Sequence, residues 1–127
     1  MAEPLAPGAT IGIVGGGQLG RMLALAAAEL GFKTHILCPE ADAPAAQVAR
    51  THTIADYEDT AALSAFADAV DIVTYEFENI PVATVAHIAP QKPVYPSTRA
   101  LEVAQDRLVE KSFMRDLGLG VADFHDI

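Results

Sequence analysis

The chain has 127 residues, which is about one domain, and its 51% hydrophobic and 20% charged residues are typical of a soluble protein that folds around a core. The 17 acidic residues outnumber the 8 basic ones, and the formal charge of −9 excludes a nucleic acid as the main partner because a polyphosphate backbone would be repelled. The first ten residues lack the features of a secretory signal and the apolar stretches are too short to cross a bilayer, so no membrane partner is expected.

The first predicted unit is a strand, a tight turn and a helix. An apolar, partly β-branched run at Thr10–Val14 predicts a buried strand, and three glycines follow it directly. From Gln18 onward, apolar residues recur at helical spacing as far as Leu30. Gly31 stands where a left-handed C-terminal cap is favoured, so the helix is expected to end there.

The middle of the chain alternates predicted strands with predicted helices. Apolar runs indicate buried strands at Thr34–Cys38 and Val70–Tyr75, and a further strand is expected at Thr51–Ile54. The alanine-rich piece Pro44–Ala49 predicts a short helix between Thr34–Cys38 and Thr51–Ile54. The segment Asp59–Ala69 predicts a longer helix, with its aspartate as the N-terminal cap.

The pattern continues to the last helical region. A helix is expected after Pro81, a brief strand at Pro93–Tyr95, and then a helical region that Ser97 caps and that runs towards Leu117 and ends at Gly118. Alternating strands and helices imply an α/β fold, a Rossmann-like open, mostly parallel sheet with helices on both faces, because right-handed crossovers place the helices there.

The expected division of the chain has three parts. Residues 1–10 form a flexible N-terminal segment that is rich in proline, and residues 11–118 form the Rossmann-like domain. Residues 119–127 are expected to begin a linker, because they do not complete a further strand or helix.

A glycine-rich turn between the first strand and the first helix is the main local motif. Gly15, Gly17 and Gly20 match the G-x-G-x-x-G pattern in the strand–turn–helix context that raises such a match above chance. Glycines allow a close approach of the backbone, and the helix N-terminus offers unpaired N–H groups and a positive dipole end. The motif favours a bound phosphate over the simpler alternative of a tight turn.

A dinucleotide site is the alternative interpretation of the same motif. Such sites place an acidic residue at the end of the second strand, where it binds ribose hydroxyls. Cys38 occupies the expected strand end here, whereas Glu40 comes two residues later, after a proline. An NAD- or nucleotide-binding Rossmann module of a dehydrogenase or a sensor, with Glu40 on the ribose, therefore stays open.

Histidine and cysteine do not form a recognisable site in the sequence. His35, His52, His87 and His125 lie on separate elements without ligand spacing, so no metal site is expected. Cys38 is the single cysteine, which excludes an internal disulfide and a CxxC motif and favours a reducing, cytoplasmic setting. No pair of nucleophile and base stands out, and no catalytic residue is expected within the chain.

Four blocks of sequence resemble one enzyme family. Taken together and in this order, they resemble the N5-carboxyaminoimidazole ribonucleotide synthases of the ATP-grasp superfamily, the ATPase-subunit type of phosphoribosylaminoimidazole carboxylase. The Tyr-Glu-Phe-Glu-Asn run and the Gln-Leu-Gly-Arg-Met continuation of the glycine motif are the specific parts. The resemblance extends over residues 11–113, and its blocks are Gly15–Met22, Ala43–Ala49, Thr74–Asn79 and Ala104–Leu108.

The resemblance implies the amino-terminal, pre-ATP-grasp part of a ligase in de novo purine biosynthesis. The whole enzyme would use ATP and bicarbonate to carboxylate 5-aminoimidazole ribonucleotide to N5-carboxyaminoimidazole ribonucleotide. ATP and Mg²⁺ would serve the full-length enzyme, whereas this fragment is expected to bind neither and to be inactive alone. The expected partners are the ribonucleotide, ATP, bicarbonate and a second copy in a homodimer, and residues 119–127 would lead towards a missing ATP-grasp domain.

The resemblance also implies roles for single residues. Gln18 and Leu19, with the three motif glycines, lie where relatives meet the ribonucleotide, and Glu76 is expected to bind its ribose hydroxyls rather than to be a solvated acid. A carboxylate suits a diol because its hydrogen bonds are charge-assisted. Arg107 matches an arginine that contacts ATP in relatives, with a plain surface position as the alternative. Arg21 is expected either near a ligand phosphate or in solvent.

Overall fold

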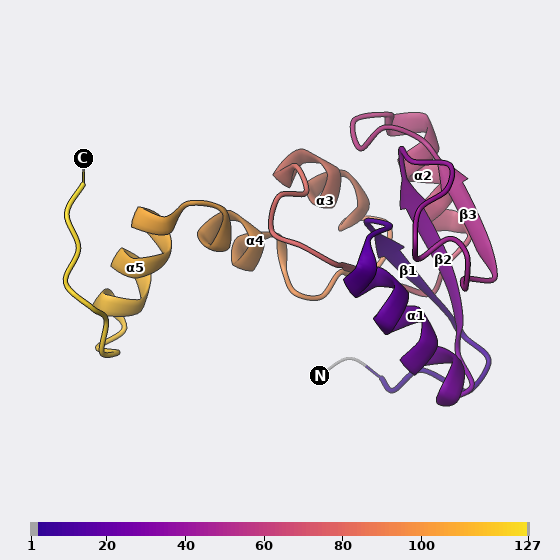
Figure 1. The fold of residues 1–127 in the computed structure, drawn as a ribbon, viewed down its shortest axis with the longest axis horizontal. Coiled ribbons are helices and arrows are strands. Elements are labelled where there is room, and N and C mark those ends of the chain that lie inside the picture. The colour runs from indigo at the N-terminus through magenta and orange to yellow at the C-terminus, as the bar shows by residue number, and fades with distance from the viewer. Residues whose placement is uncertain (1–2, 127) are drawn as a thin grey trace.

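The strands form one parallel sheet. A computed structural model describes residues 3–126, so residues 1–2 of the expected N-terminal segment and residue 127 of the expected linker lie outside the described part. Within that part the strand order is β3-β2-β1-β4, and all three neighbouring pairs are parallel (Figure 1). The strands are β1 (Thr10–Val14), β2 (Lys33–Cys38), β3 (Thr51–Ile54) and β4 (Ile72–Tyr75).

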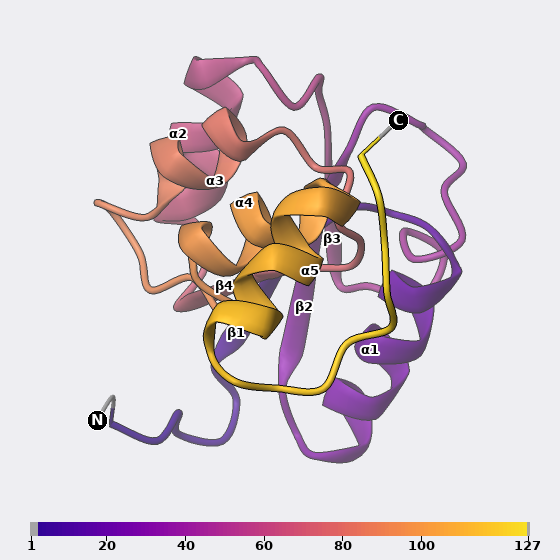
Figure 2. The ribbon, with the colours of Figure 1, turned by 90° about the vertical axis from the view of Figure 1, so that its left-hand side faces the viewer.

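Helices cover both faces of this sheet. Figure 2 shows α1 on one side of the strands and α2 and α3 on the other side. This arrangement confirms the predicted α/β class with an open parallel sheet between two helical layers. The helices are α1 (Gln18–Glu29), α2 (Thr60–Asp68), α3 (Val82–Ile88), α4 (Thr98–Gln105) and α5 (Arg107–Asp116).

The core lies in two layers, one on each face of the sheet. The central strands are apolar on both faces, as expected for a parallel sheet that is covered twice. On the face of α1, the side chains of Ile13 and Ile36 pack with Ala24. The opposite layer is larger and is made by β1, β2, β4, α2 and α3; its buried members include Val14, Leu37, Leu63, Phe66, Val73, Val85 and Ile88.

The predicted helix caps are present. The side chain of Asp59 accepts a hydrogen bond of 3.0 Å from the Ala62 N–H, and the Ser97 hydroxyl accepts one of 3.3 Å from the Ala100 N–H. Gly31 has φ +83°, which glycine adopts at little cost after a helix. The sequence rules for helix ends are therefore confirmed at these positions.

Loss of the α2 cap should be measurable. We expect Asp59→Ala to lower the free energy of unfolding by about 1 kcal/mol, because the Ala62 N–H loses its acceptor and the first turn loses a negative charge. Urea unfolding checks this, with Glu58→Ala as the control, since Glu58 is an exposed neighbour of the same charge. Equal losses for both variants would contradict a capping role.

The short helix predicted at Pro44–Ala49 is wrong. The segment forms turns instead: the Val48 and Ala49 N–H groups both donate to the Ala45 carbonyl, but no helix continues from this turn. The Ala45 N–H donates to the Gly16 carbonyl at 2.9 Å, and Arg21 Nη1 donates to the Pro44 carbonyl at 3.1 Å. Tertiary contacts thus override the helix propensity of this alanine-rich piece.

The last helical region is broken where one continuous region was predicted. Asp106 has an extended backbone, φ −115° and ψ 120°, between α4 and α5. Its side chain accepts hydrogen bonds from the Leu108 and Val109 N–H groups at 2.9 and 3.0 Å, so it starts a new helix instead of continuing the old one. The brief strand expected at Pro93–Tyr95 is reduced to an isolated parallel bridge between Val94 and Val73.

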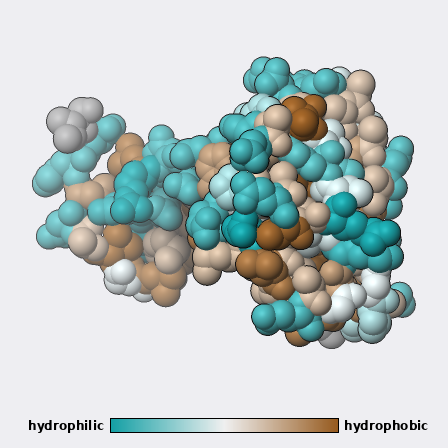
Figure 3. All heavy atoms as spheres, turned by 45° about the vertical axis from the view of Figure 1, so that its right-hand side comes forward, coloured by the Kyte–Doolittle hydropathy of each residue, from teal (hydrophilic) through white to brown (hydrophobic). Residues whose placement is uncertain are grey.

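The helices α4 and α5 form an arm that projects from the sheet (Figure 1). No residue of α5, all of which is described, is buried. Hydrophobic side chains are visible on both the arm and the main body in Figure 3. Among residues 3–126, no helix is long and apolar enough to cross a membrane.

Candidate functional site

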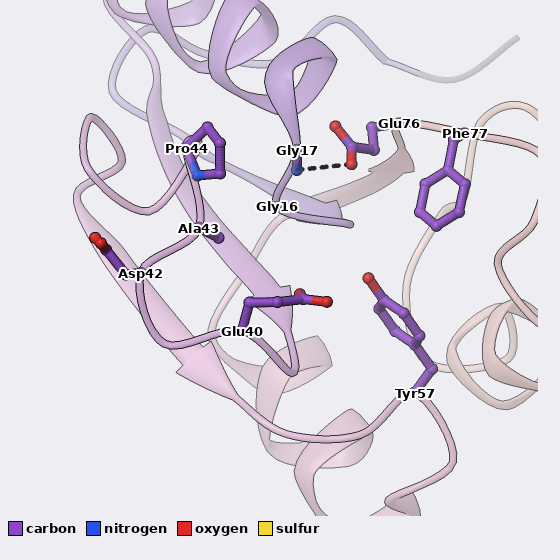
Figure 4. Close-up of a pocket in the computed structure, with 9 residues that line it drawn as sticks. All are labelled: Gly16, Gly17, Glu40, Asp42, Ala43, Pro44, Tyr57, Glu76 and Phe77. Carbon is purple, nitrogen blue, oxygen red and sulfur yellow. Dashed lines mark hydrogen bonds between the residues drawn. The ribbon is translucent and has the colours of Figure 1, made fainter.

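A pocket of about 250 Å³ lies at the carboxyl ends of the strands (Figure 4). The loops after β1, β2, β3 and β4 all contribute to it, which is the edge where open α/β sheets bind ligands. The strand order changes direction between β1 and β4, so the pocket also lies by the topological switch point. Its lining residues are Gly16, Gly17, Glu40, Asp42, Ala43, Pro44, Tyr57, Glu76 and Phe77.

The Glu76 carboxylate is bonded to the glycine loop. Its Oε1 accepts a hydrogen bond of 2.7 Å from the Gly17 N–H, and its Oε2 accepts one of 2.6 Å from the Gly20 N–H (Figure 4 draws the first). Both donors belong to the start of α1, where backbone N–H groups lack partners within the helix. The structure thus brings Glu76 and the motif glycines together, and this carboxylate occupies two N–H groups of the helix start, which was predicted from sequence to bind a phosphate.

The register of the sheet explains this contact. β1 and β4 are parallel neighbours with Val14 opposite Tyr75, and the Glu76 N–H donates to the Val14 carbonyl at 3.1 Å. Gly15 and Glu76 therefore leave the sheet side by side. Gly15 has φ +107°, a conformation that favours glycine and that turns the chain towards α1.

The pocket is lined by both acidic and aromatic side chains. Three carboxylates, of Glu40, Asp42 and Glu76, line it, and among the described lining residues none is lysine or arginine. The negative charge of such a pocket repels a phosphate dianion. It favours hydroxyl groups, which donate hydrogen bonds to the carboxylates, or a cation, which offsets their charge. The rings of Tyr57 and Phe77 supply the apolar part of the wall.

Tyr57 presents a protonated hydroxyl to this pocket. Burial, and after it the charge of Glu40, raises the pKa of the Tyr57 hydroxyl. In Figure 4 the Tyr57 hydroxyl and the Glu40 carboxylate point towards each other. The buried Thr84 hydroxyl donates a hydrogen bond of 2.6 Å to the Tyr57 carbonyl, which fixes the backbone of the loop after β3.

Arg21 holds the wall of the pocket next to α1. Its Nη1 donates to the Pro44 carbonyl at 3.1 Å and to Gln47 Oε1 at 2.8 Å. The guanidinium therefore links α1 to the loop after β2, and in this arrangement it neither lines the pocket nor points freely into solvent. Two of the four sequence blocks that carry the resemblance, Gly15–Met22 and Ala43–Ala49, meet in this contact.

Cys38 is a buried thiol at the end of β2. Its Sγ lies 3.2 Å from His52 Nε2, and burial is the main cause that raises the thiol pKa to about 11. A protonated, inaccessible thiol is a poor nucleophile. Cys38 therefore packs behind the glycine loop rather than acting in the pocket.

The raised thiol pKa predicts a loss of stability at high pH. Below pH 9.0, the ordinary value of this thiol, both the folded and the unfolded chain keep its proton. Between 9.0 and about 11 the unfolded chain loses the proton while the folded chain keeps it. The free energy of unfolding should then fall with rising pH, by at most about 1.4 kcal/mol per unit for one proton.

Urea unfolding between pH 8 and 10.5 measures this slope, and Cys38→Ala should reduce it. The pKa of the Tyr57 hydroxyl is also raised, so Tyr57 should lower the free energy of unfolding further above pH 10. The slope of Tyr57→Phe is therefore measured as a second comparison. An unchanged slope in the Cys38→Ala variant would contradict the thiol as its source.

The other predicted site residues lie outside the pocket lining. Gln18 and Leu19 begin α1, and the Leu19 side chain is 56% exposed. Arg107 begins α5 on the projecting arm; its side chain is 84% exposed, and its Nη1 lies 3.2 Å from Glu110 Oε2. The structure does not bring Arg107 to Glu76, and the roles of these three residues stay predictions.

Sequence reasoning missed Tyr57 and Asp42 and considered Glu40 only for a dinucleotide. The available signal was positional, because all three follow predicted strands closely and the carboxyl ends of parallel strands share one edge. Phe77 stood inside the Tyr-Glu-Phe-Glu-Asn block, but no role was assigned to it.

The histidines take part in ordinary side-chain contacts. His35 Nε2 lies 2.7 Å from Thr53 Oγ1, and His87 Nε2 lies 2.9 Å from Ser64 Oγ. Within residues 3–126, no three side chains of His, Cys, Asp or Glu come close enough together to hold a metal ion.

Comparisons with known proteins identify the family. The chain is 52% identical to the N5-carboxyaminoimidazole ribonucleotide synthase of Brucella melitensis over 118 residues, which are 93% of this chain and 33% of that protein. It superimposes with a TM-score of 0.92 and 42% identity on an N5-carboxyaminoimidazole ribonucleotide synthetase solved as its ADP complex, over 97% of this chain and 33% of that one.

A more distant structure is also similar. It is the Aspergillus clavatus N5-carboxyaminoimidazole synthase in complex with ADP and 5-aminoimidazole ribonucleotide, with a TM-score of 0.82, 28% identity and coverage of 91% of this chain and 31% of that one. The chain spans about a third of the length of these three relatives. Residues 8–105 match the family described as the ribonucleotide synthetase preATP-grasp domain, and the chain therefore belongs to that family.

Proposed function

We propose that this chain is the ribonucleotide-binding, amino-terminal part of an N5-carboxyaminoimidazole ribonucleotide synthase. Residues 11–118 form the binding domain, and residues 119–127 begin the linker to the ATP-grasp part. The observation that carries the proposal is the Glu76 carboxylate, which is held in a pocket at the carboxyl end of β4. Relatives that are 52% and 42% identical carry this enzyme name.

The proposed ligand contact is between Glu76 and the ribose of 5-aminoimidazole ribonucleotide. A carboxylate offers about four lone-pair positions, and the glycine loop uses two of them. The remaining two can accept the two hydroxyls of a ribose, each in a charge-assisted hydrogen bond. The rings of Tyr57 and Phe77 offer an apolar surface beside the sugar.

The charge of the pocket supports one orientation of the ligand. Glu40, Asp42 and Glu76 would repel the 5′-phosphate, so the phosphate points away from them, towards basic groups outside this pocket. The Aspergillus relative was solved with ADP and the same ribonucleotide, which supports a shared site of this kind. ATP, Mg²⁺ and bicarbonate belong to the reaction of the whole enzyme, and Arg107 is the residue of this chain that we propose for ATP.

The dinucleotide alternative has one supporting observation. Glu40 does line the pocket beside the glycine loop, as an acidic residue on a ribose would. A pyrophosphate, however, requires the N–H groups of the helix start, and Glu76 occupies those of Gly17 and Gly20. The ribonucleotide is therefore the better supported ligand.

Titration of the chain followed by backbone amide resonances tests the proposal. The ligands are 5-aminoimidazole ribonucleotide, NAD and ATP, each added separately up to millimolar concentration. We expect the ribonucleotide to shift the amides of Gly17, Glu76 and Phe77, and NAD to leave them in place. Shifts with NAD alone, or no shift with the ribonucleotide at millimolar concentration, would contradict the proposed function.

A further inference from the structure

We infer that the glycine loop of this chain binds and orients the Glu76 carboxylate and does not bind a phosphate. Gly17 and Gly20 then act as positioning residues, because their N–H groups orient Glu76 and are not free to bind the ligand. The identity of the ligand rests on the proposed function, whereas the holding of the carboxylate rests on contacts within the chain.

The space around the three motif glycines is taken up by Glu76. A Cβ atom placed on Gly17 would lie 2.7 Å from Glu76 Oε1, and the next nearest atoms would also belong to Glu76. A Cβ on Gly15 would lie 2.5 Å from Glu76 Cγ. A Cβ on Gly20 would lie 3.0 Å from Glu76 Oε2, with the Gly15 carbonyl at 3.1 Å and the Ala45 Cβ at 3.2 Å. Contacts within this chain, with Glu76 at all three positions, thus explain the absence of side chains without a phosphate.

The electrostatics of the helix start agree with this assignment. Gly17, the N-cap of α1, has no side chain to accept hydrogen bonds from the first turn. Glu76 supplies the acceptor from a strand end that is 59 residues further along the chain. Its negative charge also lies at the positive end of the helix dipole, where anions are stabilised.

The arrangement has a consequence for binding. Glu76 is fixed at its backbone by the bond from its N–H to the Val14 carbonyl of β1, and at its carboxylate by two short hydrogen bonds. A ligand that bonds to the free lone pairs therefore meets a carboxylate that loses little side-chain entropy on binding. A phosphate at the same N–H groups would have to displace an anion that is already there.

A double-mutant cycle between Gly17 and Glu76 tests the inference. In the unaltered chain, we expect Gly17→Ala to raise the equilibrium constant for unfolding about tenfold, because the new methyl group meets only Glu76 among its nearest neighbours. In the Glu76→Ala background the same change should alter that constant less than about twofold. Gly120→Ala is the matched control, since a Cβ there meets nothing within 4 Å.

Equal effects of Gly17→Ala in both backgrounds would overturn the inference. The second measurement is a titration with inorganic phosphate that follows the Gly17 and Gly20 amide resonances. We expect no shift in the unaltered chain, and a shift that saturates at low phosphate concentration would overturn the inference as well.

The two proposals fail in different ways. Energetic coupling between Gly17 and Glu76 in a chain that does not bind the ribonucleotide would refute the proposed function and support the inference about the glycine loop. Ribonucleotide binding without this coupling would support the proposed function and refute the inference.

Discussion

Phe66→Ala is expected to lower the free energy of unfolding by about 3–5 kcal/mol, a large part of the total stability of a domain of this size. The Phe66 side chain is 0% exposed and lies at the centre of the larger core layer, between α2 and the sheet. Its ring meets the His35 ring edge-on, with centroids 5.2 Å apart and an angle of 86° between the planes. Its removal leaves a cavity that backbone elements on both sides hold open.

Urea unfolding of Phe66→Ala beside Phe113→Ala checks this expectation. Phe113 carries the same side chain on the exposed arm, where it is 38% exposed, and its truncation should cost about 1 kcal/mol or less. A similar loss in the two variants would mean that the arm contributes to stability as much as the core between α2 and the sheet.

The sheet was predictable because its signal is local. The short apolar runs of β1, β2 and β4 are followed by a glycine, a proline and a glutamate, and the bounds predicted for Thr10–Val14 and Thr51–Ile54 are correct. The errors arise where distant contacts decide the conformation. Pro44–Ala49 has helix-forming alanines, yet its backbone groups bond to the glycine loop and to Arg21, which no local pattern reveals.

Two parts of the candidate site were predictable from sequence, but the hydrogen bonds between them were not. The glycine motif and Glu76 were both identified from sequence, but each was assigned to a different portion of a ligand. Their direct contact depends on the parallel pairing of β1 with β4, which sets Glu76 beside Gly15 although the two residues are 61 positions apart in the sequence. The motif alone favours a phosphate because most loops of this kind leave their N–H groups free for one.

Glu76→Ala is expected to weaken binding of 5-aminoimidazole ribonucleotide about 100-fold or more. Two hydrogen bonds between the carboxylate and ribose hydroxyls would be lost, and hydrogen bonds to a charged group contribute about 1.5–3 kcal/mol each. The affinity of Glu76→Gln should lie between those of the unaltered chain and of Glu76→Ala, because the amide keeps one acceptor oxygen and loses the charge. Calorimetric titration of the three proteins with the ribonucleotide measures the series.

Glu78→Ala is the matched control, since Glu78 is an exposed carboxylate two residues further along the same loop. If only the general negative charge near β4 mattered, Glu76→Ala and Glu78→Ala would change the affinity equally, and the specific contact would be refuted. A large loss for Glu76→Ala with an unchanged affinity for Glu78→Ala requires a carboxylate in one fixed position. The bonds from Gly17 and Gly20 hold the carboxylate in one position, so we expect the glycine loop to contribute to affinity through Glu76.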